Sequence, residues 1–427
     1  MGEQDVAGQL FNKKKSPASK DVGLFFVLVR FAIYQRRNDL LRFRSSKGLS
    51  VSCPNIMLSK GKVLKLASFF AGAGGLDYGF AQAGFSVPWA NEYDKNIWAT
   101  YERNSPKTKL NKRSIVDIDP ADIPNVDGMI GGPPCQSWSE AGMSRGIEDH
   151  RGQLFFEYLR LIEAKKPTFF LAENVSGILF SKHNSALDTI LGRFCSLGYN
   201  VSFGLLNAND FGVPQDRERV IIVGYRTELG KFFVPPSPRV EFQNKTMKDA
   251  IWDLRKSVTV AIDGTYANDN LEVANHEYLD GTFSSMFMSR NRVRSWNEPS
   301  FTIQAGGRHC PIHPQAPKME LISKDVRVFS PGHEDLYRRL SVREAARVQT
   351  FPDDFIFSYK NVLDGYKMIG NAVPVEFARQ LAEKIKQDFK LLAPNKSNAS
   401  KVGEIAHFNE LGWSRNGETS ILDTKSA

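Results

Sequence analysis

The clearest capacity for chemistry lies in residues 131–136, Gly-Gly-Pro-Pro-Cys-Gln, which follow a short apolar run. Two glycines allow the backbone to turn sharply, and two prolines stiffen it. Such a segment can hold the thiol of Cys135 at the end of a strand, where a nucleophile can reach a substrate. Taken alone, the motif favours an ordinary buried cysteine beside a Pro-rich turn, so the case for a nucleophile depends on the rest of the chain.

Three charged residues also stand at the ends of apolar runs. Glu173 follows residues 168–172, whereas Arg217 and Arg219 precede residues 220–223. Carboxyl and guanidinium groups at such positions can hydrogen-bond a substrate, and the carboxyl can exchange a proton with it. The alternatives are a salt-bridged strand end for the glutamate, which the following Asn-Val disfavours, and solvated strand ends for the arginines.

A glycine-rich loop, Phe-Ala-Gly-Ala-Gly-Gly, begins at Phe70 after the first apolar run. Its glycines, Gly72, Gly74 and Gly75, would let the backbone approach a ligand at a helix N-terminus. Glu92 ends the next strand and can accept hydrogen bonds from both hydroxyls of a ribose, while the phenyl ring can stack on a base. The spacing differs from Gly-x-Gly-x-x-Gly, so a nucleoside cofactor without a pyrophosphate is favoured over a dinucleotide. A plain tight turn and a solvated strand end are the alternatives.

Alternating strand-like and helix-like stretches must position these residues. The alternation predicts an α/β fold with a doubly wound, mostly parallel sheet covered by helices on both faces. Ligands bind such sheets at the carboxyl ends of the strands, where Gly72, Glu92, Cys135 and Glu173 are all expected. The predicted strands are residues 63–70, 85–92, 127–131, 168–173, 201–208 and 219–223, and the predicted helices are residues 76–83, 95–103 and 153–164.

Seven motifs in a fixed order over residues 63–390 resemble those of the DNA (cytosine-5)-methyltransferases, which depend on S-adenosyl-L-methionine. The likeness is greatest to the HaeIII-type modification methyltransferases, which modify the inner cytosine of GGCC. It implies the S-adenosylmethionine-dependent methyltransferase fold with a smaller inserted target-recognition domain, and a role in a restriction-modification system. The motifs are FAGAGG from Phe70, Asn91-Glu92-Tyr93, GGPPCQSW around Cys135, Glu173-Asn174-Val175, QDRER at residues 215–219, REAARVQ at residues 343–349 and GNAVP at residues 370–374.

The resemblance implies catalytic roles for four residues. The thiolate of Cys135 would add to C6 of cytosine and activate C5, and Glu173, kept protonated by burial, would hydrogen-bond N3. Arg219 would hold the cytosine O2, and Arg217 would support the catalytic loop. The target base must leave the duplex to be reached from both faces, and residues 139–151 are predicted to close over it.

The same resemblance implies a set of cofactor contacts. Ser114 stands where the family often has an acidic residue near the end of the third strand, and Asp117 follows three positions later. A hydroxyl would accept a hydrogen bond from the adenine amino group more weakly than a carboxylate would. The expected contacts are Phe70, Gly72, Gly74, Gly75, Glu92, Tyr93, Ser114, Ile115, Pro133 and Asn371.

Recognition of DNA is expected from residues 225–340, which interrupt the βαβ rhythm. Residues 289–296, Ser-Arg-Asn-Arg-Val-Arg-Ser-Trp, can project arginines from one face of an extended segment, and an arginine can contact guanine at two points. From the residues alone, a generic phosphate-binding patch is favoured. Two histidines and one thiol in residues 309–313 fall short of a four-ligand zinc site, so no metal is expected. The resemblance assigns base readout to Arg290, Arg292 and Arg308.

The predicted domain organisation follows from these breaks in pattern. The N-terminal extension is expected to be disordered or untranslated, with translation starting at Met57; a signal peptide is the alternative, but arginines follow the apolar run of residues 23–29. The C-terminal segment is expected to be a flexible tail. The boundaries are 1–60 for the extension, 61–224 for the catalytic and cofactor domain, 225–340 for the target-recognition domain, 341–393 for the return to the catalytic domain and 394–427 for the tail.

Composition limits the partners and the compartment. The 427 residues are 41% hydrophobic, enough for two domains, and the net charge of +9 fits double-stranded DNA as a partner. Residues 1–56 hold 10 Lys and Arg against 4 Asp and Glu, so most of that charge lies outside the expected catalytic region. Four scattered cysteines without a CxxC pair fit a reducing bacterial cytoplasm. The longest apolar run is too short to cross a membrane.

Three other functions are weighed against DNA methylation. An RNA cytosine-5-methyltransferase could share the thiol and the carboxyl, but the arginines of residues 289–296 favour duplex DNA. A catalytically silent DNA-binding regulator would need neither Cys135 nor Glu173, and an NAD-dependent oxidoreductase leaves the thiol unexplained. A symmetric four-base site methylated one strand at a time predicts a monomer. The other expected partner is a restriction endonuclease that acts on the same site without direct contact.

Overall fold

The computed structural model describes residues 62–134, 150–180, 184–238, 245–390, 402–409, 412–415 and 418–420. The chain divides into two compact units, residues 1–55 and 56–427, and all described residues belong to the second. The predicted N-terminal extension, residues 1–60, therefore lies wholly outside the described residues. Among the described residues, no helix is long and apolar enough to span a membrane.

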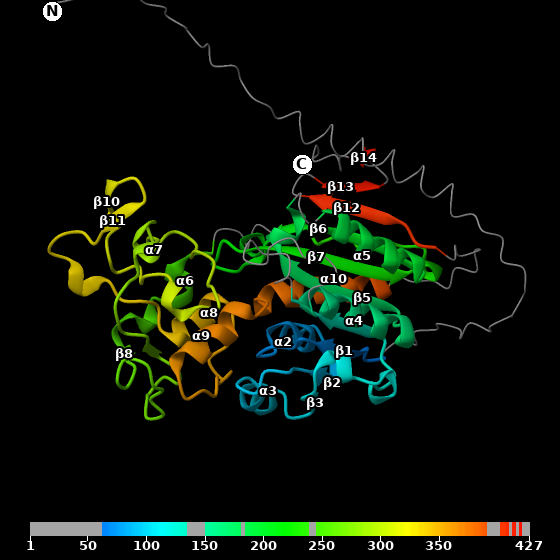
Figure 1. The fold of residues 1–427 in the computed structure, drawn as a ribbon, viewed down its shortest axis with the longest axis horizontal. Coiled ribbons are helices and arrows are strands. Elements are labelled where there is room, and N and C mark those ends of the chain that lie inside the picture. Colours follow the sequence, from blue (N-terminus) through cyan, green and yellow to red (C-terminus); the bar gives the residue numbers. More distant parts are fainter. Residues whose placement is uncertain are drawn as a thin grey trace, which may run out of the picture. The chain divides into compact units, whose positions relative to one another are not determined.

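One large sheet organises the described residues (Figure 1). Its strand order is β14-β13-β12-β6-β7-β5-β4-β1-β2-β3, with parallel pairing from β3 through β5 and β7 antiparallel to both β5 and β6. The prediction of a mostly parallel α/β sheet is confirmed. The strands are β1 Lys65–Phe69, β2 Ser86–Asn91, β3 Lys109–Asn111, β4 Gly128–Gly131, β5 Phe169–Val175, β6 Tyr199–Asn207, β7 Glu218–Arg226, β12 Ile405–Asn409, β13 Gly412–Arg415 and β14 Glu418–Ser420.

Side-chain alternation along the strands explains why both faces of the sheet are covered. Leu66, Ile130, Leu171 and Ile221 join one core with α2 (Gly75–Gln82) and α10 (Val375–Lys390). The adjacent residues Ala67, Met129, Phe170 and Ile222 join a second core with α4 (His150–Lys165) and α5 (Asn184–Ser196). Because successive strand residues face opposite sides, strands that are apolar at every position require helices on both.

The C-terminal strands correct the prediction of a flexible tail from residue 394. Strand β12 pairs in parallel with β6, and Phe408 is buried in the core shared by α2 and α10. The close approach is possible because β6 carries Gly204, where a Cβ would lie 2.1 Å from the Phe408 carbonyl oxygen. The apolar residues Ile405 and Ala406 stand among short polar stretches, and such a sequence resembles a flexible tail. It forms a strand here because the edge of the sheet at β6 offers unpaired backbone groups.

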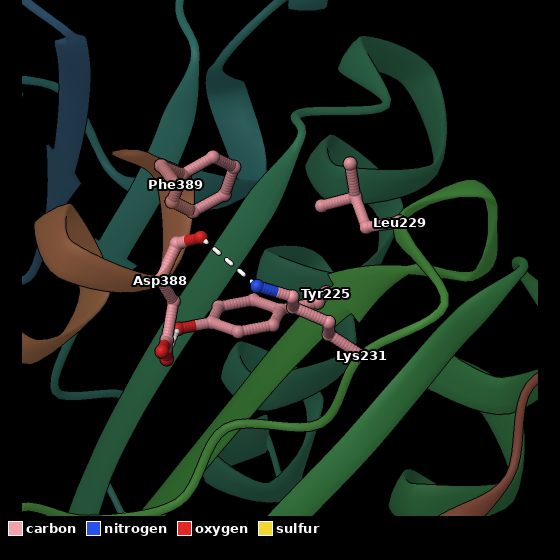
Figure 2. Close-up of a pocket in the computed structure, with 5 residues that line it drawn as sticks. All are labelled: Tyr225, Leu229, Lys231, Asp388 and Phe389. Carbon is pink, nitrogen blue, oxygen red and sulfur yellow. Dashed lines mark hydrogen bonds between the residues drawn. The ribbon is translucent and has the colours of Figure 1, made fainter. Parts of the chain in front are cut away.

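Helix α10 is fixed to strand β7 by polar as well as apolar contacts (Figure 2). The hydroxyl of Tyr225 donates to Asp388 Oδ2 at 3.0 Å, and Lys231 Nζ donates to the Asp388 carbonyl at 3.4 Å. Burial and the neighbouring carboxylate hold the pKa of Tyr225 well above its ordinary value. The crevice between these side chains is a packing feature that joins the final helix to the sheet.

Residues 227–340 contain short elements that do not extend the large sheet. They pack around two further apolar clusters, one of which includes residues from the helices that follow. Their elements are α6 Met247–Ile251, β8 Thr259–Val260, β9 Glu277–Tyr278, α7 Ser285–Met288, β10 Glu320–Ser323 and β11 Val326–Val328, with 3-10 turns including η10 Asp253–Lys256 and η11 Gly307–His309. The chain then returns through α8 Val342–Val348 and α9 Val362–Asn371.

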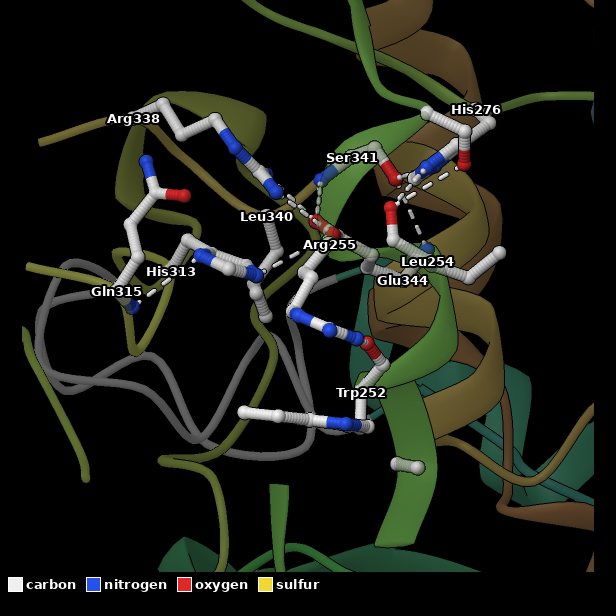
Figure 3. A network of polar contacts seen from close by, with 12 residues as sticks. Trp252, Leu254, Arg255, His276, His313, Gln315, Arg338, Leu340, Ser341 and Glu344 are labelled. Atoms are coloured by element: carbon white, nitrogen blue, oxygen red, sulfur yellow. Dashed lines mark hydrogen bonds and ion pairs between the residues drawn. The ribbon is translucent and has the colours of Figure 1, made fainter. Parts of the chain in front are cut away.

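A capping box starts α8 (Figure 3). Ser341 Oγ accepts a hydrogen bond from the Glu344 backbone N–H at 3.0 Å, and the Glu344 carboxylate accepts one from the Ser341 N–H at 2.8 Å. The buried Glu344 also receives two hydrogen bonds from Arg338, at 2.7 and 2.8 Å. These paired charges join the last residues before the helix to its first turn.

Candidate active site

A cleft of about 390 Å³ opens where the predicted site residues converge. It lies at the carboxyl ends of β1, β2, β4 and β5, and the end of α9 closes one side. This is the edge at which open α/β sheets bind ligands. The lining includes Phe70, Gly72, Glu92, Pro133, Glu173 and Asn371 from the predicted set, together with Ser68, Asp94, Ile97, Asn174 and Met368.

The loop between β1 and α2 is held in a strained shape by Glu92. Phe70 has a φ of 51°, a left-handed conformation that a phenylalanine rarely adopts, and Gly72 has a φ of 56°. The Gly72 N–H donates to Glu92 Oε2 at 2.8 Å, and the Asp94 N–H donates to Oε1 at 2.7 Å. Burial raises the pKa of Glu92. The carboxylate therefore fixes the loop and also presents its remaining lone pairs near the cleft.

A buried carboxyl beneath this loop was missed in the sequence. Asp77 Oδ1 accepts a hydrogen bond from Ser68 Oγ at 2.6 Å, and Oδ2 accepts one from the Tyr101 hydroxyl at 2.5 Å. Burial raises the pKa of Asp77 to about 6. The Tyr101 ring lies against Gly74, where a Cβ would be only 3.2 Å away. The available signal was an acidic residue on the apolar face of a predicted helix.

On the other side of the cleft, Glu173 forms an ion pair with Arg219. Nε of the arginine lies 2.8 Å from Oε1 of the glutamate, and each side chain is 11% exposed. The antiparallel register of β5 and β7 places Arg219 opposite Val175, so the two charged side chains are diagonal neighbours on one face. The salt-bridged strand end that the sequence disfavoured is thus what this chain adopts, because two nearly buried charges are stable only when paired.

Asn174 holds the backbone that precedes the predicted nucleophile. Its side-chain amide donates to the Pro133 carbonyl at 3.0 Å, and this contact is buried. A Cβ on Gly132 would lie 3.2 Å from Glu173 Oε2, so the glycine allows the carboxylate to approach the loop. Cys135 itself and residues 139–149 of the predicted lid lie outside the described residues. Asn174 is absent from the predicted site, because its role depends on a contact with the loop after β4 that no local pattern shows.

Arg217 serves a different purpose from its neighbour Arg219. It is fully buried and donates to the carbonyls of Ile303, Gly370 and Ala372 at 2.9 to 3.0 Å. Burial lowers its pKa well below the ordinary value. The side chain fastens three segments that are distant in sequence: the start of β7, residues before η11, and the loop after α9.

The remaining predicted cofactor residues do not line the cleft. Gly75 contacts the Val373 backbone, Tyr93 is 72% exposed, and Ile115 is buried in the core shared by α4 and α5. Ser114 precedes a 3-10 turn, Ile115–Asp117, and is partly buried. Gly74 supports the loop from behind, against the Tyr101 ring. Their assignment as cofactor contacts stays a prediction.

The three predicted recognition arginines have unequal environments. Arg290 and Arg308 are exposed, whereas Arg292 is partly buried over the Phe287 ring, with its guanidinium carbon 5.0 Å from the ring centre. Nε of Arg292 donates to the Phe287 carbonyl at 3.1 Å. Burial, followed by repulsion from Arg290, lowers the pKa of Arg292. An even row of arginines on one face is therefore not what this segment presents.

The His-Cys-His stretch at residues 309–313 is packed rather than arranged for a ligand. Cys310 is fully buried, and burial raises its pKa to about 12. His313 lies 3.5 Å from the Glu344 carboxylate (Figure 3), and burial lowers its pKa to about 4. Among the described residues, no group of three or more His, Cys, Asp or Glu side chains could hold a metal ion.

Both the sequence and the fold of this chain are similar to those of known proteins. Residues 64–387 match the model of the C-5 cytosine-specific DNA methylase family. Type II methyltransferase M.MthTI of Methanothermobacter thermautotrophicus is 54% identical over 77% of this chain and 98% of its own. Type II methyltransferase M.NgoPII of Neisseria gonorrhoeae is 53% identical over 76% of this chain and 96% of its own.

Solved structures share the fold at lower identity. A protein encoded in an Escherichia coli prophage and named as a putative DNA modification methyltransferase has a TM-score of 0.59 at 24% identity, over 77% of this chain and 99% of its own. The Entamoeba histolytica methyltransferase EhMeth has a TM-score of 0.56 at 16% identity over the same shares. These two likenesses concern the fold alone.

Proposed function

We infer that this chain, which belongs to the C-5 cytosine-specific DNA methylase family, methylates the inner cytosine of GGCC in double-stranded DNA. It is a DNA (cytosine-5)-methyltransferase of the Type II restriction-modification kind. The observation that carries the proposed chemistry is the Glu173–Arg219 pair, whose glutamate lies beside Gly132 in the lining of the cleft that also contains the glycine-rich loop.

The cleft residues fit S-adenosyl-L-methionine. Each oxygen of Glu92 accepts one backbone hydrogen bond and keeps lone pairs that can accept from ribose hydroxyls. Phe70 lies in the same lining and can stack on adenine, while the loop at Gly72 lets backbone come close. The cofactor would supply an electrophilic methyl group. Two chain segments, the loop after β1 and the end of α9 at Asn371, would orient that group toward the residues after β4.

The chemistry at the base is assigned to side chains of the chain itself. The Cys135 thiolate forms a sulfur–carbon bond at C6, and the displaced electron pair makes C5 nucleophilic. Glu173 takes up a proton from solvent as the base enters and donates it in a hydrogen bond to N3, and Arg219 holds O2, so both stabilise the ring as charge develops. After C5 is methylated, loss of its proton returns electrons to the ring and expels the thiolate.

Access requires the cytosine to leave the duplex, since a stacked base exposes neither face of C5 and C6. The Glu173–Arg219 ion pair then exchanges part of its mutual contact for contacts with the base. Recognition of the guanines is assigned to Arg290 and Arg308, whose exposure leaves their donors accessible, and to Arg292 once it turns from the Phe287 carbonyl.

Bisulfite sequencing of plasmid from cells that express the chain tests site and chemistry together. Protection of the inner cytosine of GGCC, and loss of that protection in Cys135→Ser, is the expected result. Protection at another sequence would replace the GGCC proposal, and unchanged protection in the variant would remove the thiol from the mechanism.

A mechanism-based trap tests the covalent step separately. A GGCC duplex with 5-fluorocytosine at the inner position should remain covalently attached to the protein when the methyl donor is present, because fluorine cannot leave as a proton does. The same duplex without the donor is the control. Absence of a stable adduct would contradict the thiolate addition.

A further inference from the structure

Arg290, Arg292 and Arg294 form a series of alternating arginines, the arginine series. Unlike the other two, Arg294 contacts the segment that leads into β7 of the large sheet. Its Nη2 lies 2.8 Å from Asp216 Oδ2, and its Nη1 lies 3.4 Å from Glu298 Oε1. The guanidinium carbon is 4.2 Å from the centre of the Phe301 ring. These three contacts fix the plane of the guanidinium as well as its position.

Asp216 stands next to the residues proposed to act on the base. It precedes Arg217, which anchors three segments, and it lies three residues before Arg219. Its backbone is fixed too: the Asp216 N–H donates to the Ser300 carbonyl at 2.9 Å, and the Thr302 hydroxyl donates to the Asp216 carbonyl at 2.5 Å. A shift of Asp216 would therefore move the start of β7.

The other end of the connection is equally constrained. The Ile312 N–H donates to the Arg292 carbonyl at 3.0 Å, which fixes the backbone two residues before Arg294. The turn that follows is closed by the Ser295 N–H, which donates to Glu298 Oε2 at 2.8 Å. Because Arg290 and Arg292 are four and two residues from Arg294, movement of these guanidiniums onto DNA bases acts on the same short, tethered segment.

Stability does not account for the Arg294–Asp216 pair. The two side chains are 26% and 41% exposed, and ion pairs of that exposure contribute about 1 kcal/mol or less. Backbone hydrogen bonds from Ser300 to Pro214 and Asp216 already join the two segments. The ion pair adds a contact of fixed geometry between Arg294 and Asp216, the residue before Arg217.

We propose that Arg294 is a positioning residue that couples recognition of the DNA site to the geometry of the Glu173–Arg219 pair through Asp216. The inference rests on the proposed function, since it requires that residues 290–292 read the DNA. Cognate contacts hold the segment where the Arg294–Asp216 pair keeps the start of β7, and with it Arg219, in place beside Glu173. A non-cognate duplex lacks those contacts, and the chemical step is slower.

The test compares single-turnover methylation of a GGCC duplex with that of an AGCT duplex, which keeps the inner cytosine and changes only the outer pairs. The proteins are the parent, Arg294→Met, Asp216→Asn and the double variant. Asp253→Asn is the matched control, because it also removes a carboxylate paired with an arginine from another segment, Arg347.

Each single variant should lower the ratio of GGCC to AGCT rates by about tenfold, and the double variant should lower it no further, as expected for residues that act through one contact. The control should keep the parent ratio. Arg294→Lys, which keeps the charge without the planar fork, should give an intermediate ratio and serves if Arg294→Met does not fold.

Equal slowing on both duplexes, or losses that multiply in the double variant, would overturn the coupling role and leave a structural contact. A parent protein without preference for GGCC would instead overturn the proposed function, and with it the premise of this inference. The two failures are distinguished by the parent measurement alone.

Discussion

The cleft and the arginine segment, residues 289–308, differ in the burial of their charged side chains and in the regularity of their backbone. In the cleft, Glu173 and Arg219 are nearly buried and pair with each other, and they sit on adjacent strands of a regular sheet. In the arginine segment, Arg290 and Arg308 are exposed on irregular backbone held by side-chain hydrogen bonds. A reacting centre benefits from fixed groups shielded from water, whereas a surface that reads DNA must stay hydrated until phosphates and bases replace the water.

Among the changes below, breaking the Glu173–Arg219 pair should slow methylation the most. Glu173→Gln should slow methylation by about 10²–10⁴-fold, because the amide cannot exchange a proton with N3. Single-turnover rates with a GGCC duplex measure this, and the dissociation constant for the duplex should stay within about threefold. Glu376→Gln, which removes a carboxylate paired with Arg379 on α10, is the control. A rate within tenfold of the parent would mean that the cleft is not the reacting centre.

Arg217, which bonds the carbonyls of Ile303, Gly370 and Ala372, should contribute to the stability of the fold. Arg217→Met should lower the free energy of unfolding by about 3–5 kcal/mol, because three buried carbonyls lose their donor. Denaturant unfolding measures the loss. Arg343→Met is matched, since Arg343 is also fully buried and bonded to backbone carbonyls.

Arg217→Met and Arg343→Met together separate an effect on stability from an effect on the cleft. Both should be destabilised to a similar degree, but only Arg217→Met should also slow methylation at a temperature where both are folded. Parent-like methylation in both would mean that Arg217 is an anchor without influence on the cleft.

Burial of Asp77 predicts a pH-dependent contribution to stability. Its pKa is about 6 in the folded chain against an ordinary 3.8, so protonation favours the folded state. This contribution is complete below about pH 4 and is lost as the pH rises through 6, a change of about 3 kcal/mol. Relative to the parent, Asp77→Asn should therefore gain up to that amount in free energy of unfolding between pH 4 and pH 7.

Denaturant titrations at several pH values within this range provide the measurement. Asp117→Asn, at an exposed position, should keep the pH profile of the parent. A difference between Asp77→Asn and the parent that does not vary with pH would show that the carboxyl is ionised throughout.

The smallest effect is expected in the arginine segment. Arg290→Ala should weaken binding to a GGCC duplex by about 1–3 kcal/mol and relax preference at one guanine, with no change in stability, because the side chain is exposed. Competition binding against duplexes with single substitutions measures both quantities. Arg193→Ala, at an exposed position on α5, is the control. Equal weakening on every duplex would identify a phosphate contact instead.

The sequence predicted the cleft better than the arginine segment, because the cleft lies at the ends of regular strands and the arginine segment does not. The loop at Gly72, the acidic end of β2 at Glu92 and the carboxyl at Glu173 were all found, because apolar runs mark strands and parallel strands end at one edge. In the arginine segment, spacing suggested equivalent side chains for Arg290, Arg292 and Arg294. Their environments differ because local hydrogen bonds, not a regular strand, set the backbone there.

Local patterns of apolar and turn-forming residues were enough to predict most strands and helices between residues 63 and 226 and the edge of the sheet at which the chemical groups collect. Only the tertiary structure decided that Glu173 pairs with Arg219, that Arg217 bonds three distant carbonyls and that β12 adds to the sheet. Each of these depends on which distant segment is close enough to satisfy a buried charge or an unpaired strand edge. That choice is made by packing of the whole chain, and no local pattern encodes it.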